Sequence, residues 1–246
     1  MNLTWHIIKK DLYQFRWSLA LWLACFAYIF LVQEKVSFHG NIDLRDYFRL
    51  ISILTIAVIS CAMLIGIIQQ DHPTDSRAFW RTRPIAPGRL VAAKLGLLLT
   101  LFVGIPLLTI MARGWLQQLV VLQTFREYSL MILVLGSITL SLAAAAACTS
   151  NIAYALLLWL GVVFGSGTLA EALDRFLPKL TLRLSQQMNM QRVITLLVFS
   201  VVISLAIILN QYLRRRFTTS VILLILGSVG SSLIGVLWSY YYFYQG

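Results

Sequence analysis

The sequence predicts an all-α protein, a polytopic bundle of six to seven transmembrane helices that begins with an interfacial helix. Three observations lead to this fold class. Hydrophobic residues make up 59% of the 246 residues and charged residues only 12%, whereas charged residues are about a quarter of a typical soluble domain. The mean hydropathy is +0.82. The apolar residues also gather in long runs between short polar segments, which is typical of helices that cross a bilayer.

The N-terminal segment, residues 1–16, is expected to form an amphipathic helix at the membrane surface. One helical stripe would collect its apolar side chains, namely Trp5, Ile8, Leu12 and Phe15, while the neighbouring lysines turn away. A basic flank that only orients the first span is the alternative. A signal peptide is not favoured, because the apolar run that follows is bulky and has no small-x-small cleavage site.

Seven apolar runs are expected to cross the membrane, and the whole chain, residues 1–246, is treated as one transmembrane domain. The runs are residues 17–32, 50–68, 90–111, 128–148, 152–170, 193–213 and 221–237. In the third run, Gly104 and Pro106 should kink the helix and free a backbone carbonyl that a neighbouring helix must satisfy. The polar tripeptide 149–151 predicts a tight turn, so the fourth and fifth runs should form a hairpin.

The segments between these runs are assigned to the two membrane surfaces from the distribution of Lys and Arg. The N-terminus, the segment 71–89 and the three arginines at 214–216 carry the larger share of the cations and are placed in the cytoplasm. The opposite surface then holds a loop over residues 34–49, a short interfacial helix over residues 113–127 and an interfacial element over residues 171–192. The expected location is the inner (plasma) membrane.

The net charge of +11 does not indicate a nucleic-acid-binding protein. The cations lie at the ends of apolar runs, where they set membrane topology, and not in one cluster that could follow a phosphate backbone. Membrane lipids are therefore expected partners of these charges, and nucleic acid is not. The three cysteines, Cys25, Cys61 and Cys148, lie inside apolar runs without a CxxC motif, which predicts buried hydrophobic roles and no metal site or disulfide.

Residues 71–89 form the longest polar, cation-rich segment between two apolar runs. Cations and an aromatic pair alternate along it: Arg77, Phe79, Trp80, Arg81, Arg83 and Arg89. A short helix is expected over residues 76–82. A side-chain oxygen of Thr74 or Asp75 can cap its first turn, and Pro84 ends it.

This pattern of a polar start, a short aromatic helix, an Arg-Pro-Ile tripeptide and a lysine that opens a membrane helix resembles the loop after the second span of ABC-2 type transporter permeases. The matching residues are Asp75, Phe79, Trp80, Arg83, Pro84, Ile85, Arg89 and Lys94. The N-terminal amphipathic helix and the number of spans agree with the same family in layout. The motif itself covers only residues 71–95.

The resemblance implies a permease subunit that works with a separate cytoplasmic ABC ATPase and with a second permease copy, as a homodimer or a heterodimer. The short helix would be the coupling helix that sits in a cleft of the ATPase. The coupling residues implied are Asp75, Arg77, Phe79, Trp80, Arg81, Arg83, Pro84, Arg89 and Lys94. The alternative is that these cations only bind anionic lipid, at about 1 kcal/mol each, and fix the topology.

Other classes of membrane protein are disfavoured by what the sequence lacks. It has no G-x-x-x-x-G-K-[ST] motif for ATP, so no cofactor is expected and energy must come from a partner. None of the expected spans has an ionisable residue near its middle, which argues against ion-coupled carriers and intramembrane proteases. His6, His39 and His72 lie in three separate segments, which predicts no metal site and no catalytic site.

The expected function is therefore that of the permease subunit of an ATP-driven ABC-2 type exporter, and not that of an enzyme. The alternative is a membrane structural or accessory protein without its own transport path, and a third, weaker option is a membrane enzyme. Small residues at four-residue spacing indicate close helix packing, within one subunit or at a dimer seam. They are Gly161 with Gly165, Gly227 with Ser231 and Gly235, and Ser137 with Ser141 and Ala145.

Overall fold

A computed structural model describes residues 3–31, 44–70, 86–116, 121–176, 190–214 and 217–245. Throughout these ranges the chain is helical or lies in short turns between helices, with no strand. Four of the described helices are long and apolar enough to cross a membrane: Leu50–Gln69, Pro87–Ala112, Tyr128–Cys148 and Val193–Arg214. Two further apolar stretches are shorter, Ile152–Gly165 and Phe217–Leu233. In its described parts the chain is thus helical, with the long apolar helices of a membrane protein.

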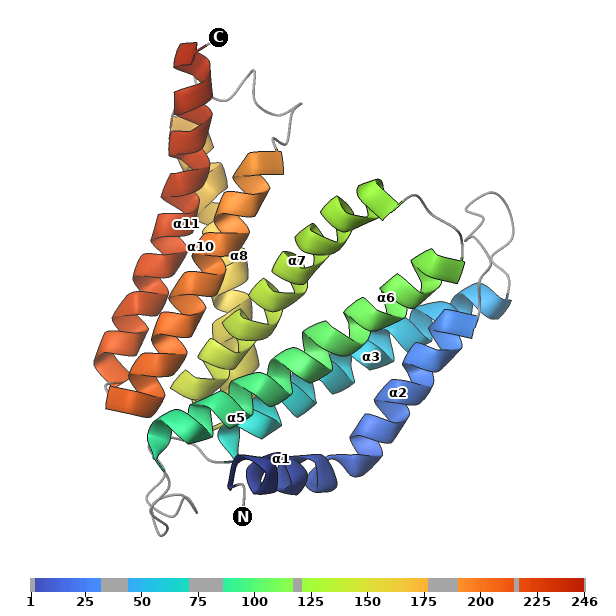
Figure 1. Ribbon diagram of the computed structural model, residues 1–246. Helices are drawn as coiled ribbons and strands as arrows, with labels where there is room; N and C mark the ends of the chain where they lie inside the picture. Colours follow the sequence, from blue (N-terminus) through green and yellow to red (C-terminus); the bar gives the residue numbers. More distant parts are fainter. Residues whose placement is uncertain are drawn as a thin grey trace.

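The first half of the chain comprises α1 (Leu3–Gln14), α2 (Arg16–Leu31), α3 (Leu44–Gln69), α5 (Pro87–Leu99), the π-helical segment η1 (Thr100–Gly104) and α6 (Ile105–Leu116). The second half comprises α7 (Val121–Cys148), α8 (Ile152–Phe176), α10 (Met190–Leu209), the π-helical segment η2 (Asn210–Arg214) and α11 (Phe217–Gln245). Figure 1 shows that α5, η1 and α6 form one continuous rod, and that α1 lies across one end of the bundle.

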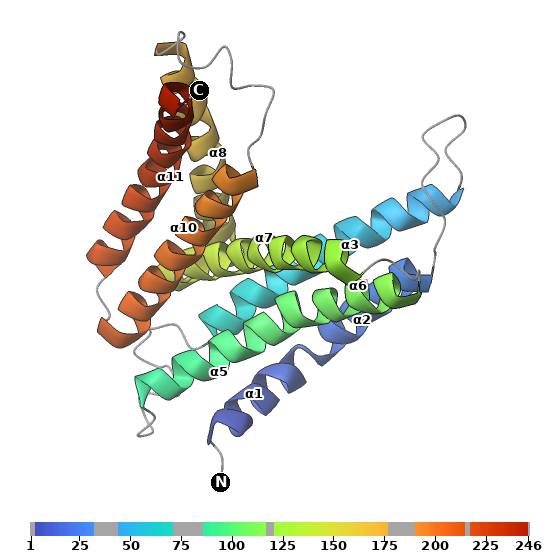
Figure 2. The ribbon, with the colours of Figure 1, turned by 45° about the horizontal axis from the view of Figure 1, so that its top comes forward.

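Helix α7 is the centre of the bundle. It packs against α10, α3, α8 and η1, and 56% of its membrane-spanning stretch is buried, more than in any of the other three long spans described. Figures 1 and 2 show α8, α10 and α11 on one side of α7 and α2, α3, α5 and α6 on the other. The residues Ala143, Ala144, Ala145, Ala146 and Ala147 are all buried. Their small side chains let neighbouring backbones approach closely.

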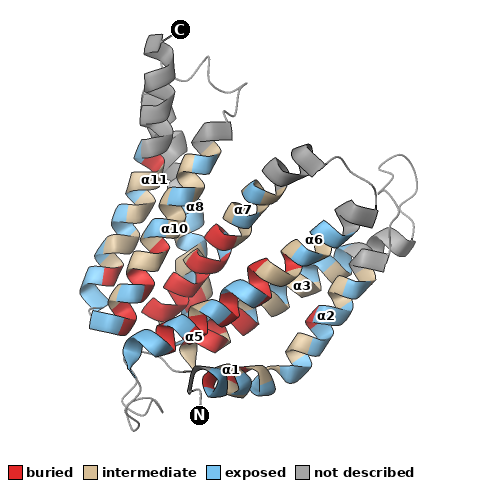
Figure 3. Ribbon diagram, in the orientation of Figure 1, coloured by how far each residue is buried: buried red, intermediate tan, exposed pale blue. Residues whose placement is uncertain are grey.

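The buried residues concentrate toward the end of the bundle that holds α1, where α3, α5, α7 and α10 converge (Figure 3). Toward the opposite end the described parts of the two groups of helices diverge (Figure 1). The predicted tight turn at residues 149–151 is confirmed: the Asn151 side chain accepts a hydrogen bond from the Ala153 N–H at 2.9 Å, and α8 begins directly after α7.

Several expected connecting elements are replaced by longer helices. No separate interfacial helix covers the described part of residues 113–127, because α6 continues to Leu116 and α7 begins at Val121. Helix α8 likewise runs to Phe176, into the segment 171–192 that was expected as an interfacial element, and α3 already begins at Leu44. A helix satisfies its own backbone hydrogen bonds wherever it lies, so a change to polar side chains marks a membrane boundary and need not end the helix.

Where Gly104 and Pro106 predict a kink, the structure has the π-helical segment η1 within a continuous rod. Pro106 has no N–H to donate to the carbonyl four residues earlier, and its ring would clash with that carbonyl in a regular helix. In η1 the N–H of Ile105 donates instead to the carbonyl of Thr100, five residues earlier. A π-helical turn holds one residue more than an α-helical turn, so the helix continues past Pro106 without ending.

Helix α1 buries a different stripe from the one predicted. Ile8, Leu12 and Phe15 pack against the core as expected, but the side chain of Trp5 is 62% exposed. The deeply buried side chains of the helix are Ile7 and Asp11. The apolar pattern misplaced the stripe because it could not include an acidic residue, and Asp11 is the residue that fixes which face of α1 turns inward.

Candidate functional site

The ends of several helices are joined by side chains at the end of the bundle that holds α1. We call this region the basal junction. It consists of Asp11, Ile67, Ile68, Gln69, Lys94, Thr149, Gln211 and Tyr212. These residues come from α1, the end of α3, α5, the turn after α7, and η2.

A buried ion pair lies at the centre of the basal junction. The Nζ atom of Lys94 is 2.8 Å from Oδ2 of Asp11 and donates a second hydrogen bond, of 2.7 Å, to the carbonyl oxygen of Ile67. Both charged side chains are only 1% exposed. The last carbonyls of an α-helix have no partner within the helix, so Lys94 satisfies one at the end of α3 while it neutralises Asp11 on α1. One side chain therefore connects α1, α3 and α5.

Other side chains extend the same arrangement to α7 and α10. The Tyr212 hydroxyl donates to the carbonyl of Ile68 at 3.3 Å, and the Gln69 Nε2 atom donates to the carbonyl of Thr149 at 3.0 Å. The π-helical turn η2 places the consecutive residues Gln211 and Tyr212 both in the interior. The ends of α3, α7 and α10 are thus held together by side chains that use otherwise unpaired helix carbonyls.

The predicted coupling residues fall into three groups. Asp75, Arg77, Phe79, Trp80, Arg81, Arg83 and Pro84 lie outside the described residues. Arg89 is exposed in the first turn of α5. Lys94, five residues later, is buried against Asp11, so it faces the interior of the subunit and not a partner. A coupling role of Lys94 stays a prediction, and its charge is paired within the chain.

Asp11 was not predicted as a residue of the basal junction. The sequence does contain a pattern that points to Asp11. It is the only acidic residue among residues 1–16 and lies four residues after Ile7, on the same helical face. An acidic residue on the apolar face of an amphipathic helix indicates a buried partner of opposite charge. The sequence offered many cations, and only the fold shows which one pairs with it.

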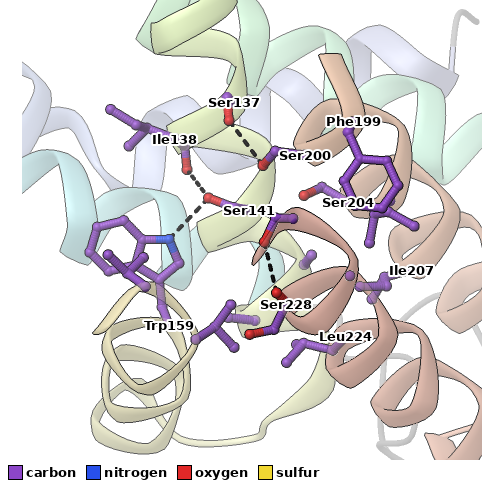
Figure 4. A pocket seen from close by; sticks show the side chains of 17 residues that line it. Ser137, Ile138, Ser141, Trp159, Phe199, Ser200, Ser204, Ile207, Leu224 and Ser228 are labelled. Carbon is purple, nitrogen blue, oxygen red and sulfur yellow. Dashed lines mark hydrogen bonds between the residues drawn. The ribbon is translucent and has the colours of Figure 1, made fainter. Parts of the chain in front are cut away.

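A second site lies away from the basal junction, between α7, α8, α10 and α11. It is a cavity of about 400 Å³, shown in Figure 4, and we call it the serine chamber. Six serines line it: Ser137, Ser141, Ser200, Ser204, Ser228 and Ser231. Apolar side chains such as Phe199, Ile203 and Leu224 form the rest of the wall.

Hydrogen bonds join the helices around the serine chamber. The Ser137 hydroxyl on α7 bonds to the Ser200 hydroxyl on α10 at 3.0 Å. The Nε1–H of Trp159 on α8 donates to the Ser141 hydroxyl at 3.0 Å, and that hydroxyl donates to the carbonyl of Ile138 at 3.0 Å. Figure 4 shows these side chains turned toward one another. The predicted stripe of Ser137, Ser141 and Ala145 thus lines a cavity between helices.

The remaining small residues differ in how closely a neighbouring helix approaches them. A side chain added at Gly227 would come within 2.7 Å of Ile203 on α10, so this glycine permits close packing of α11 inside the subunit. Ser231 donates to the carbonyl of Ser228 at 2.8 Å. Gly161 and Gly165 have no atom within 4 Å of an added side chain. Gly235 lies outside the residues whose side chains are described. A role of any of these small residues in a dimer seam stays a prediction.

Replacing Gly227 by leucine is expected to destabilise the protein by about 1–3 kcal/mol, because overpacking would force α10 and α11 apart. The matched change, Gly161→Leu, should leave the unfolding free energy within about 0.5 kcal/mol, since the space beside Gly161 within the chain is open. Unfolding in a detergent mixture, followed by circular dichroism, measures both. If the two variants are equally stable, the close α10–α11 contact at Gly227 is not important for the fold.

No protein-family model, curated protein or solved structure matches this chain. Within the part of the chain that the structure describes, no group of three or more His, Cys, Asp or Glu residues could hold a metal ion.

Proposed function

We propose that the chain is the membrane subunit of an ABC-2 type transporter, driven by a separate cytoplasmic ATPase that binds residues 71–89. The observation that carries this proposal is the position of the basal junction relative to that segment. Residues 71–85 connect the end of α3 to the start of α5, and these are the two elements that Lys94 joins through the carbonyl of Ile67. A force on the segment reaches the basal junction from both sides.

The basal junction supports transmission of such a force into the bundle. Because Lys94 also binds Asp11, α1 must follow any movement of α5. The bonds from Gln69 to Thr149 and from Tyr212 to Ile68 pass the movement on to the ends of α7 and α10. Those two helices pack against each other and both line the serine chamber. In this proposal Phe79 and Trp80 are the apolar anchors on the ATPase, since aromatic residues and arginines dominate the energetics of many interfaces.

The proposal predicts that an ATPase copurifies with the chain from its native membrane. The double change Phe79→Ala and Trp80→Ala should reduce the copurified ATP hydrolysis at least tenfold, because losing two aromatic anchors costs roughly 2 kcal/mol or more of binding free energy. Trp5→Ala is the matched control, since Trp5 is an exposed aromatic residue on α1, outside the segment 71–89, and it should leave the activity unchanged. Hydrolysis per mole of chain is the quantity to measure.

Two outcomes would contradict the coupling role. Unchanged hydrolysis in the Phe79 and Trp80 variant would show that the ATPase does not bind there. A wild-type chain that purifies without ATPase activity would favour the alternative, a membrane structural or accessory protein. In both cases the cations of residues 71–89 would keep only their roles in lipid binding and topology.

A further inference from the structure

The serine chamber lies at mid-depth of the membrane-spanning helices. Ser137 and Ser141 fall near the middle of the span Tyr128–Cys148, and Ser200 and Ser204 near the middle of the span Val193–Arg214. Hydroxyl groups at this depth are far from bulk water and must find partners in protein or in a bound molecule. The chamber thus concentrates hydrogen-bonding groups where the surrounding lipid offers none.

Helix packing alone does not account for this site. Serines that only hold two helices together let the backbones close over them, as the buried alanines at the end of α7 do. Here the bond from Ser137 to Ser200 coexists with about 400 Å³ of open space. That volume lies within the range of about 300–1,000 Å³ that is usual for small-molecule sites.

The groups lining the chamber define the chemistry of an occupant. Among the described residues that line it there is no Asp, Glu, Lys, Arg or His. A charged molecule would lose its hydration there without gaining a counter-charge, at a cost of several kcal/mol. An oxygen-bearing neutral molecule would instead find partners. Whichever hydroxyl of the Ser137 and Ser200 pair donates to the other, the second keeps its own hydrogen for a further acceptor.

A further hydroxyl is available at Ser204, which is buried and lines the chamber. None of the hydrogen bonds drawn among the lining residues in Figure 4 reaches it. The chamber also reaches the outer surface of the bundle, because two of its lining residues, Ile138 on α7 and Val163 on α8, are 48% and 45% exposed. At this depth the medium outside is the hydrocarbon of the bilayer.

We infer that the serine chamber binds a neutral lipid alcohol, a molecule with an uncharged hydroxyl-bearing head and an apolar chain, which enters from the bilayer between α7 and α8. The head lies among Ser200, Ser204 and Ser137, and the chain contacts Phe199 and Ile203. The Trp159 to Ser141 bond connects the two helices that flank the entrance. This inference concerns binding alone and does not require that the chain transports its ligand or contacts an ATPase.

A photoactivatable monoacylglycerol with an alkyne tag tests the inference on the full chain in lipid nanodiscs without nucleotide. The informative pair is Ser200→Thr and Ser200→Val, two side chains of nearly equal shape of which only the first has a hydroxyl. Ser200→Thr should keep the half-saturating mole fraction of the monoacylglycerol within about twofold of wild type. Ser200→Val should raise this mole fraction about three- to tenfold, because one hydrogen bond to the lipid is lost.

Two further variants separate binding from folding. Ser204→Leu fills the chamber, so labelling should fall at least tenfold while thermal stability is retained or raised. Ser129→Ala, on an exposed part of α7, should label like wild type. A monoacylglycerol of the same chain length that ends in a sulfonate should compete poorly, because none of the described lining residues is a cation.

The inference is overturned if Ser200→Val and Ser204→Leu label like wild type, or if the sulfonate competes as well as the neutral lipid. It is also overturned if peptide mapping places the crosslinks on α2 or α3 and not on the helices of the chamber. Binding with the expected variant pattern but without any copurified ATPase would support the chamber and reject the transporter proposal, so the two can fail separately.

Discussion

Replacing Lys94 by methionine is expected to lower the unfolding free energy by roughly 3–5 kcal/mol, among the largest effects of a single change in this chain. Methionine is similar in length, so packing is largely kept, but Asp11 would remain buried at 1% exposure without its cation. Leaving one member of a buried ion pair uncompensated costs about that much. The Ile67 carbonyl would also lose its donor. Reversible unfolding in mixed detergent micelles measures the change.

The chain provides a matched control and a rescue for this prediction. Arg89→Met removes an exposed cation from the same helix and should cost less than about 0.5 kcal/mol. Replacing both partners, with Asp11→Leu and Lys94→Met, should recover most of the stability, because two apolar side chains of similar volume often equal or exceed a buried ion pair. If Lys94→Met and Arg89→Met are equally stable, the pair does not hold α1 in place.

Replacing Trp22 by alanine is expected to cost roughly 3–5 kcal/mol, the usual range for a buried aromatic residue. Trp22 is 1% exposed, its ring lies 4.5 Å from Phe26 and 5.9 Å from Phe102 between centroids, and its Nε1–H donates to Ser60 at 2.7 Å. It thereby connects α2 to α3 and η1. Because lipid is as apolar as these side chains, the loss comes from packing contacts and from the hydrogen bond.

Two further substitutions separate the contribution of the Trp22 ring contacts from that of its hydrogen bond to Ser60. Trp17→Ala affects the same helix at a position that is 75% exposed, and it should change the unfolding free energy little. Trp22→Phe keeps most of the ring but removes the donor to Ser60, and should cost about 1 kcal/mol. A Trp22→Ala variant as stable as Trp17→Ala would show that α2 is not fastened to the bundle at this point.

The fold class could be predicted because hydropathy is a property of each segment by itself. A run such as residues 193–213 needs an apolar environment, lipid or protein, whichever helices pack beside it. The helix at Gly104 and Pro106 is irregular for an equally local reason. Helix ends were predicted less well, since residues 121–127 and 171–176 were expected in separate interfacial elements and yet continue α7 and α8.

The sites could be predicted only in part, because they depend on contacts between distant residues. Asp11 and Lys94 are separated by 83 positions in the chain, and nothing in their neighbouring residues shows that they pair. The serine chamber combines residues from four helices. Its stripes of small residues suggested close packing, whereas the actual spacing of α7, α8 and α10 leaves a cavity. The coupling function of Phe79 and Trp80 stays a prediction.

The ion pair between Asp11 and Lys94 also sets an order of events during synthesis of the protein. Asp11 leaves the ribosome long before Lys94, which follows 83 residues later. A carboxylate is costly to bury before its counter-charge arrives, so we expect the first helix to stay in contact with water until Lys94 has been synthesised. Its final docking is therefore a late step of assembly, and a nascent chain that stops before Lys94 should leave that helix accessible from the aqueous side.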